Sequence, residues 1–182
     1  MKKILAILAV VASATAFAGP SVQVEYTDEK NDTNNTTSAV YGLTVKNQFA
    51  KGWYGDIGGT TTQQDGTKTL SQRLEAGVTY EPLSWVYVRG AVGEKFSNGS
   101  SNAYYSIEPG LKFPVAANLT GKVAYRYRNA FDVDKFNTQE ENTYRVGLTY
   151  AVTPQSALGV GYDYTNGDVE KKAWKLSYTH SF

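Results

Sequence analysis

The sequence has 182 residues, of which 41% are hydrophobic, and it carries a net charge of +1 with no cysteine. This length suits a single domain, a balanced charge gives no reason to expect a nucleic-acid partner, and the lack of cysteine excludes disulfides as the source of stability. With one histidine in the chain, a histidine-rich metal site is disfavoured, and we expect neither a metal nor another cofactor.

The N-terminal segment 1–18 has the layout of a secretory signal peptide. Lys2 and Lys3 precede a short apolar run, and the segment ends in Ala-Phe-Ala, the small-residue pattern of a cleavage site. A membrane-anchoring helix is the alternative, but the apolar run is far shorter than the ~20 residues needed to cross a bilayer. We therefore predict cleavage after Ala18, which leaves 19–182 as one domain.

The rest of the chain alternates between apolar and polar residues over short segments, which is the pattern of β-strands. In "LEAGVTY", for example, Leu74, Val78 and Tyr80 share one face, while Glu75 lies on the other. In chain order, the predicted strands are 20–27, 38–49, 53–63, 70–81, 84–95, 103–113, 117–129, 142–152, 156–165 and 172–182. Because Pro109 lacks a backbone donor, we expect a local break in strand pairing at that residue.

The connections between these strands fall into two alternating classes. The short turns "FAKGW", "EPLSW", "PVAAN" and "VTPQSA" alternate with polar, mostly longer loops such as "DEKNDTNNTT" and "DVDKFNTQEE". An even number of strands with short turns at one end and longer loops at the other is typical of bacterial outer-membrane barrels. The predicted fold is therefore all-β: a transmembrane antiparallel up-and-down β-barrel of about ten strands, with twelve or eight as alternatives, and with both termini on the periplasmic side.

A soluble periplasmic sandwich or lipocalin-like barrel has the same alternation, but its apolar face points inward. The apolar parity is free of charge in essentially every predicted strand, which favours a face in contact with lipid. Large aromatic residues also gather near the strand ends, as an interfacial girdle requires. These residues are Phe49, Trp53, Tyr80, Phe113, Tyr150, Tyr164 and Trp174. We therefore expect an integral protein of the outer membrane.

If the apolar parity faces lipid, the opposite parity lines the lumen, and it is rich in basic residues. Its predicted bases are Lys46, Arg73, Arg89, Lys95, Lys112, Lys122, Arg126, Arg128, Arg145 and Lys175. Its predicted acids are Glu25, Asp56, Glu75, Glu108 and Asp163. Basic residues along a pore lower the barrier for anions, so the pattern predicts a narrow channel for small anionic solutes. The alternative is that these charges pair with one another and close the lumen.

Three stretches, "YSIEPGLKF", "LTGKVAYRYRNAF" and "NTYRVGLTY", resemble the oligogalacturonate-specific porin family, which also includes the sialic-acid channels. The resemblance implies a narrow monomeric outer-membrane barrel that passes acidic oligosaccharides along an arginine-lined lumen. It would place Arg126, Arg128 and Arg145 among the lining residues, in agreement with their parity. Barrels of that family have twelve strands, whereas the alternation here predicts ten.

The chain ends in "KLSYTHSF", an alternating aromatic strand closed by Phe182. Tyr178 and Phe182 resemble the terminal signal by which outer-membrane barrels are recognised for assembly. His180, the one histidine, falls on the outward parity at the periplasmic interface, and we expect neither an acid nor a nucleophile beside it. The sequence therefore predicts no catalytic residue and no enzymatic activity.

The main alternative to a channel is a non-conducting structural or adhesive barrel whose polar extracellular loops bind a partner. In either case the expected partners are outer-membrane lipid, lipopolysaccharide and the barrel-assembly machinery, to which a channel adds a small anionic solute.

Overall fold

The computed structural model describes residues 19–65, 70–97, 100–132 and 140–182. The predicted signal peptide covers residues 1–18, which lie outside the described residues, and its cleavage stays a prediction. Over the described ranges, no helix has the length and apolar character that crossing a bilayer requires.

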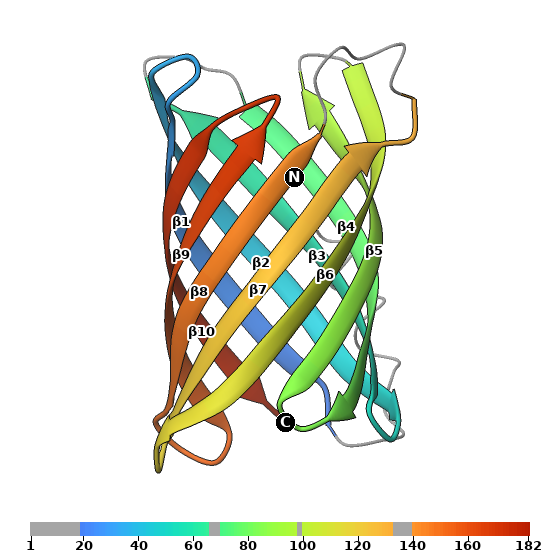
Figure 1. Ribbon diagram of the computed structural model, residues 1–182, viewed down its shortest axis with the longest axis vertical. Helices are drawn as coiled ribbons and strands as arrows, with labels where there is room; N and C mark the ends of the chain where they lie inside the picture. The colour runs from blue at the N-terminus through green and yellow to red at the C-terminus, as the bar shows by residue number, and fades with distance from the viewer. Residues whose placement is uncertain (1–18, 66–69, 98–99, 133–139) are drawn as a thin grey trace.

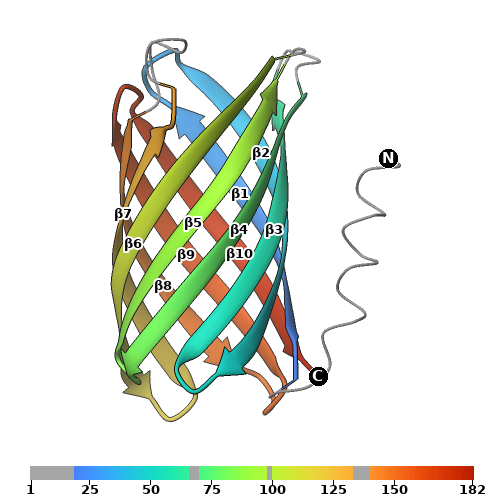
Figure 2. The ribbon, with the colours of Figure 1, turned by 90° about the vertical axis from the view of Figure 1, so that its right-hand side faces the viewer.

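The described residues form ten antiparallel strands that close into a single barrel (Figures 1 and 2). Each strand pairs with its neighbours in the chain, and β1 pairs with β10 to close the sheet. The strands are β1 (Ser21–Asn31), β2 (Thr36–Ala50), β3 (Trp53–Gln64), β4 (Leu70–Leu83), β5 (Val86–Ser97), β6 (Ser100–Ala116), β7 (Leu119–Ala130), β8 (Glu141–Ala151), β9 (Ser156–Gly167) and β10 (Lys171–Ser181). The predicted ten-stranded up-and-down barrel is confirmed.

The two ends of the barrel differ in their connections, as predicted. The turn between β2 and β3 consists of Lys51 and Gly52, and Gly52 has a φ of 74°, a conformation that favours glycine. The C-terminus lies at the end of the barrel that carries the short turns (Figures 1 and 2), where the Phe182 amide donates to the Pro20 carbonyl at 3.1 Å. Since outer-membrane barrels place short turns on the periplasmic side, this is the periplasmic end.

The two faces of the barrel separate apolar from polar side chains. Outward residues such as Val92, Leu148 and Leu176 are exposed, with 55% of Val92 and 58% of Leu176 accessible. In water this apolar surface would be a large exposed patch, whereas in a membrane it contacts lipid. The soluble alternative, which requires the apolar face inside, is therefore wrong.

Aromatic residues flank the apolar band at both ends. Near the periplasmic end, the rings of Trp53 and Tyr80 stack with 4.4 Å between their centroids. Near the extracellular end, Tyr105 and Phe131 contact each other at 5.3 Å, and the ring of Tyr144 stacks on a neighbouring tyrosine. These positions agree with the predicted interfacial girdles.

Several strands continue beyond the apolar band at the extracellular end, which the sequence did not indicate. β1, predicted over 20–27, stays paired with β10 as far as Asn31. Asp28 and Lys30 therefore lie on the outward face, as does Glu94 of β5, which pairs with the outward Leu74. The expectation that the outward parity is free of charge is wrong for these strand ends, because they extend past the hydrocarbon layer.

The expected irregularity at Pro109 occurs as a gap in one ladder. Pro109 pairs with Val88 of β5, whereas the pairs between β6 and β7 pass from Ile107 and Tyr127 directly to Gly110 and Ala124 without a change of register. Proline has no amide hydrogen to donate. The pairing between β6 and β7 is therefore interrupted without a bulge at this point, while β6 itself continues.

Candidate functional site: the barrel lumen

A cavity of about 620 Å³ runs along the lumen. Its walls include Lys46 and Thr179 near the periplasmic end and Glu29 and Lys171 near the extracellular end. Every predicted pore-lining residue contributes to these walls: Lys46, Arg73, Glu75, Arg89, Lys112, Glu108, Lys122, Arg126, Arg128, Arg145 and Lys175. Their location is thus as expected, while their role in permeation stays a prediction.

Four charged lining residues were missed by the parity argument. Glu29, Glu141 and Lys171 lie just beyond the predicted strand ends, and Glu81 was assigned to the short turn "EPLSW". With them, the described lining carries eleven basic and eight acidic residues. The lumen is therefore basic, but less so than the ten bases and five acids of the sequence argument suggested.

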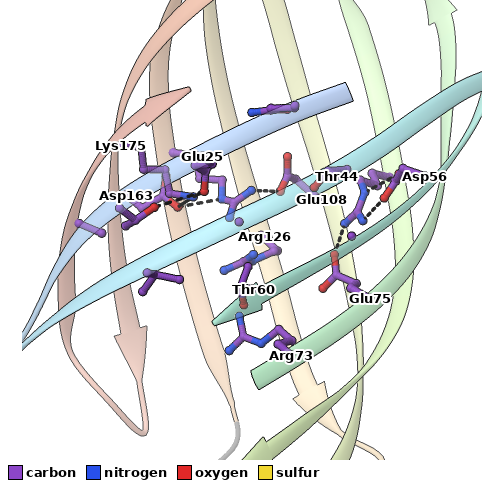
Figure 3. Close-up of a pocket in the computed structure, with 18 of the residues that line it drawn as sticks. Glu25, Thr44, Asp56, Thr60, Arg73, Glu75, Glu108, Arg126, Asp163 and Lys175 are labelled. Carbon is purple, nitrogen blue, oxygen red and sulfur yellow. Dashed lines mark hydrogen bonds and ion pairs between the residues drawn. The ribbon is translucent and has the colours of Figure 1, made fainter. Parts of the chain in front are cut away.

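The cavity lies against a wall of small residues. β2 and β3 contribute Gly42, Thr44, Gly58 and Thr60 to its lining. Long charged side chains reach toward this wall from β4 to β8 and from β10 (Figure 3). Small side chains on one side leave the space that the charged side chains do not fill.

Glu108, on β6, is the centre of the largest ion-pair network. Its side chain is 3% exposed and accepts hydrogen bonds from Tyr87 Oη at 2.8 Å, Lys122 Nζ at 3.1 Å and Arg145 Nη1 at 2.7 Å. Three donors satisfy most of the acceptor capacity of this carboxylate and offset the cost of its burial.

The network continues from Arg145 around the barrel (Figure 3). Arg145 Nε lies 3.2 Å from Asp163 Oδ2, and Lys175 Nζ bridges Asp163 at 3.1 Å and Glu25 at 3.2 Å. One chain of charges thus links β6 to β1 through β8, β9 and β10.

A second network occupies β3, β4 and β5. Arg89 Nε donates to Asp56 Oδ2 at 3.0 Å, and Arg89 Nη1 lies 2.7 Å from Glu75 Oε1. Nearer the periplasmic end, Glu81 pairs with Lys112 at 2.6 Å and Lys46 at 3.5 Å. The alternative to an open lumen, in which the charges pair with one another, therefore agrees with the ion pairs of the middle and periplasmic parts.

Two inward tyrosines organise the bases around these networks. Tyr87, on β5, lies over Gly110, and the ammonium groups of Lys112 and Lys122 lie 5.4 and 5.0 Å from its ring centroid. With Glu108, which accepts from the Tyr87 hydroxyl, these residues form what we call the periplasmic tyrosine group.

Tyr104, on β6, repeats this arrangement nearer the extracellular end. It lies over Gly93, donates to Glu75 Oε2 at 2.9 Å, and has the guanidinium carbons of Arg73 and Arg128 at 5.5 and 5.2 Å from its ring centroid. We call these five residues the extracellular tyrosine group. In both groups a glycine on the neighbouring strand leaves room for the phenol ring.

Three lumen bases have no carboxylate partner within the described part of the chain: Arg73, Lys95 and Arg126. Arg126 donates to Thr143 Oγ1 at 3.4 Å, and its Nε is buried without a hydrogen-bond partner, as is that of Arg73. Figure 3 labels Arg73 and Arg126 among the residues that line the cavity. Of the three arginines grouped by the resemblance, Arg145 pairs with Glu108 and Asp163, Arg128 pairs with Glu141, and Arg126 has no carboxylate partner among the described residues.

No protein-family profile matches the chain, and neither does any curated protein. Solved structures do match it. The translocator domain of the autotransporter NalP from Neisseria meningitidis has 9% identity and a TM-score of 0.54, covering 100% of this chain and 95% of that one. The NanC porin has 6% identity and a TM-score of 0.54, covering 87% and 100%. The KdgM porin, solved in complex with disordered oligogalacturonate, has 11% identity and a TM-score of 0.51, covering 88% and 99%.

The chain is an outer-membrane β-barrel. Its resemblance to the oligogalacturonate porins, first seen in short sequence stretches, is confirmed at the level of the fold by the KdgM and NanC structures. Because the barrel is closed and its outward face is apolar, it is an integral membrane barrel, and the outer membrane is the location that agrees with its fold. The matching structures are porins and translocators and not enzymes.

The C-terminal strand of the outer-membrane barrel corrects one expectation. Ser156 Oγ lies 3.0 Å from His180 Nδ1 and 3.1 Å from Tyr178 Oη, so a hydroxyl does accompany the histidine. The contact arises because the β9–β10 register places Ser156 opposite His180, which the sequence alone does not reveal. No carboxylate among the described residues contacts His180, and its ring packs edge-on against Phe182 at 4.8 Å. The assembly role of Tyr178 and Phe182 stays a prediction.

Proposed function

We propose that the protein is an outer-membrane channel that passes small anionic solutes through a narrow basic lumen. The observation that carries this proposal is a cavity lined along the barrel by more bases than acids, in which Arg73, Lys95 and Arg126 have no carboxylate partner among the described residues. The charge of a paired base is neutralised by its carboxylate, whereas an unpaired base can still bind an anionic solute.

The physical argument concerns the energy of an ion inside the barrel. Basic groups along a narrow passage lower the barrier for anions and raise it for cations. Guanidinium groups add directional hydrogen bonds to carboxylate and phosphate oxygens. The fold likeness to the KdgM porin, whose structure contains oligogalacturonate, supports a channel role without identifying the solute here.

Conductance of the refolded protein in a planar bilayer tests the proposal. We expect a stable conductance whose reversal potential in a salt gradient indicates preference for the anion. Arg126→Glu, which changes the local charge by two units at a base without a carboxylate partner among the described residues, should reduce that preference at least severalfold. Lys51→Gln, in the exposed periplasmic turn, removes a positive charge outside the lumen and should leave selectivity unchanged. A correctly folded barrel without any conductance would contradict the proposal.

A non-conducting structural or adhesive barrel is the second candidate, and the ion-pair networks favour it. Glu108, Arg145 and Asp163 join β6, β8 and β9 through ion pairs inside the lumen. The same bilayer measurement separates the two functions, because a structural barrel conducts no ions. In both cases we propose that lipid and lipopolysaccharide contact the outward face, and that the barrel-assembly machinery recognises Tyr178 and Phe182.

A further inference from the structure

Besides Lys171, which pairs with Glu29, four bases gather in the extracellular half of the lumen: Arg73 on β4, Lys95 on β5, and Arg126 and Arg128 on β7. We call them the upper cationic cluster. Lys95 lies within Coulombic range of Arg73 and Arg128, and Arg126 and Arg128 lie within range of each other and of Arg73. Like charges at this density repel one another, so the cluster needs a counter-charge.

The nearby carboxylates supply only part of that charge. Glu75 accepts from Tyr104 through one oxygen and pairs with Arg89 through the other. Glu141 pairs with Arg128, and it also lies 3.7 Å from Lys171. Within the described residues, three of the four cluster bases therefore have no carboxylate at ion-pair distance, although Glu108 and Asp163 act on Arg126, and Glu29 on Lys95, from farther away.

Tyr104 holds part of the cluster in place before any ligand arrives. Its hydroxyl is fixed by Glu75, and its ring attracts the guanidinium groups of Arg73 and Arg128. Arg128 is 5% exposed, yet its Nη1 is buried without a hydrogen-bond partner, as are Nε of Arg73 and Nε of Arg126. Buried charged donors without acceptors are costly. Arg145 Nε also lacks a hydrogen bond but lies 3.2 Å from the Asp163 carboxylate, whereas the three donors above belong to side chains of the cluster.

We propose that the upper cationic cluster is a buried binding site for a doubly charged oxyanion: phosphate, sulfate, or the terminal phosphate monoester of a small solute. This inference rests on the proposed function, in that it names the class of anion the lumen holds, but binding itself does not require conduction. A tetrahedral oxyanion has enough acceptor oxygens for donors from several directions, and guanidinium groups match it well. A single carboxylate or chloride would neutralise only one of the three unpaired bases.

The periplasmic tyrosine group shows why the site belongs to the extracellular half. Its two lysines surround Tyr87 as the arginines surround Tyr104, but Lys122 pairs with Glu108 and Lys112 pairs with Glu81. These lysines already have anionic partners and offer little to an added anion.

Isothermal titration calorimetry of the refolded barrel in detergent micelles tests the site. The titrants are sulfate, inorganic phosphate and glycerol phosphate, compared with chloride and monomeric galacturonate at equal ionic strength. We expect saturable binding of one dianion per barrel, weakened at least about tenfold by Arg73→Gln because a charge-assisted contact is lost. Lys51→Gln should leave the affinity unchanged. If Arg73→Gln does not refold, as judged by heat-modifiable migration on a gel, Lys95→Gln replaces it.

A pH series adds a signature that a purely structural effect would not produce. Glycerol phosphate should lose affinity as the pH falls through about 6, where a phosphate monoester becomes singly charged, while sulfate keeps its affinity. Tighter binding of glycerol phosphate than of inorganic phosphate would identify an organic phosphate as the occupant, and the reverse order would identify a free oxyanion.

Three results would overturn the inference: no saturable binding of any dianion to the folded barrel, equal binding of chloride or galacturonate, or an equal loss with Lys51→Gln. Conductance without dianion binding would overturn the inference and leave the channel proposal intact. Dianion binding without conductance would support the inference and contradict the channel proposal.

Discussion

The two tyrosine groups of the lumen share a scaffold but differ in their supply of carboxylates. In each, a tyrosine lies over a glycine of the neighbouring strand, donates to a glutamate, and holds two bases against its ring. The two lysines around Tyr87 both pair with carboxylates, whereas Arg73 beside Tyr104 pairs with none of the described ones. The same local geometry therefore stabilises the barrel through ion pairs at the periplasmic end, and at the extracellular end it leaves a base without a carboxylate partner among the described residues.

The largest effect is expected where the periplasmic group is anchored. Glu108→Gln removes the charge that Lys122 and Arg145 share. Breaking a buried pair from one side costs about 3 kcal/mol, and the free energy of unfolding should fall by that amount in urea titrations of the barrel in lipid vesicles. Asp28→Asn, on the exposed outward face, should change it by less than about 0.5 kcal/mol. An unchanged free energy of unfolding for Glu108→Gln would show that these ion pairs do not stabilise the barrel.

The glycines beneath the two tyrosines should be sensitive to the same substitution. At Gly110 a Cβ would collide with the Tyr87 ring, and at Gly93 with Tyr104. We expect Gly110→Ala and Gly93→Ala each to destabilise the barrel by about 2 kcal/mol through overpacking. Gly90 has nothing within 4 Å of its added Cβ, so Gly90→Ala in the same strand pair serves as the control. Unequal losses at Gly110 and Gly93 would show that the two scaffolds are not equivalent.

Removing an unpaired base should stabilise the barrel, whereas the substitutions above should destabilise it. Arg73→Met keeps an apolar contact with Tyr104 and relieves repulsion on Lys95. We expect a gain of about 1 kcal/mol in unfolding free energy at low salt, as is common when a functional site is relaxed. Lys112→Met, which breaks the pair with Glu81, should instead reduce stability. If both variants are destabilised alike, the distinction between paired and unpaired bases fails.

The smallest effect concerns a partly exposed ion pair at the extracellular end of the barrel. Lys172, and then Lys30, hold the pKa of the Asp32 carboxyl in the β1–β2 loop below its ordinary value of 3.8. A lowered folded-state pKa stabilises the protein above the ordinary value, and this stabilisation is lost as the pH falls through the folded-state pKa. Wild type and Asp32→Asn should therefore differ slightly in unfolding midpoint at pH 6 and converge near pH 2. A difference that persists at low pH would contradict this assignment.

The fold was predictable because strand parity and turn length are local properties. Leu74 and Glu75 already lie on opposite faces in the sequence, and this alternation places lining residues correctly without any knowledge of neighbouring strands. Strand ends were less predictable, since pairing continues after the apolar alternation stops. Glu29, Glu141 and Lys171 were missed for that reason.

Pairing inside the lumen was not predictable, because it depends on register and on side-chain reach across the barrel. Arg126 and Arg145 look alike in the sequence, yet Arg145 reaches Glu108 and Asp163, while Arg126 faces Thr143. The contact between Ser156 and His180 likewise follows from the β9–β10 register. The sequence could count the charges but could not say which of them remain free.

Because small residues on β2 and β3 form one wall of the lumen, the width of the passage and its preference for ions depend on different residues. The width of the passage depends on uncharged residues such as Gly42. An added Cβ there would lie 3.5 Å from its nearest neighbours, which is a normal van der Waals distance. Ionic preference depends on long charged side chains, most of which lie on other strands; Lys46 on β2 and Asp56 on β3 are the exceptions in the described lining. A lineage of such barrels is therefore free to widen or narrow the passage by substitutions in β2 and β3 without altering the charge that a solute encounters.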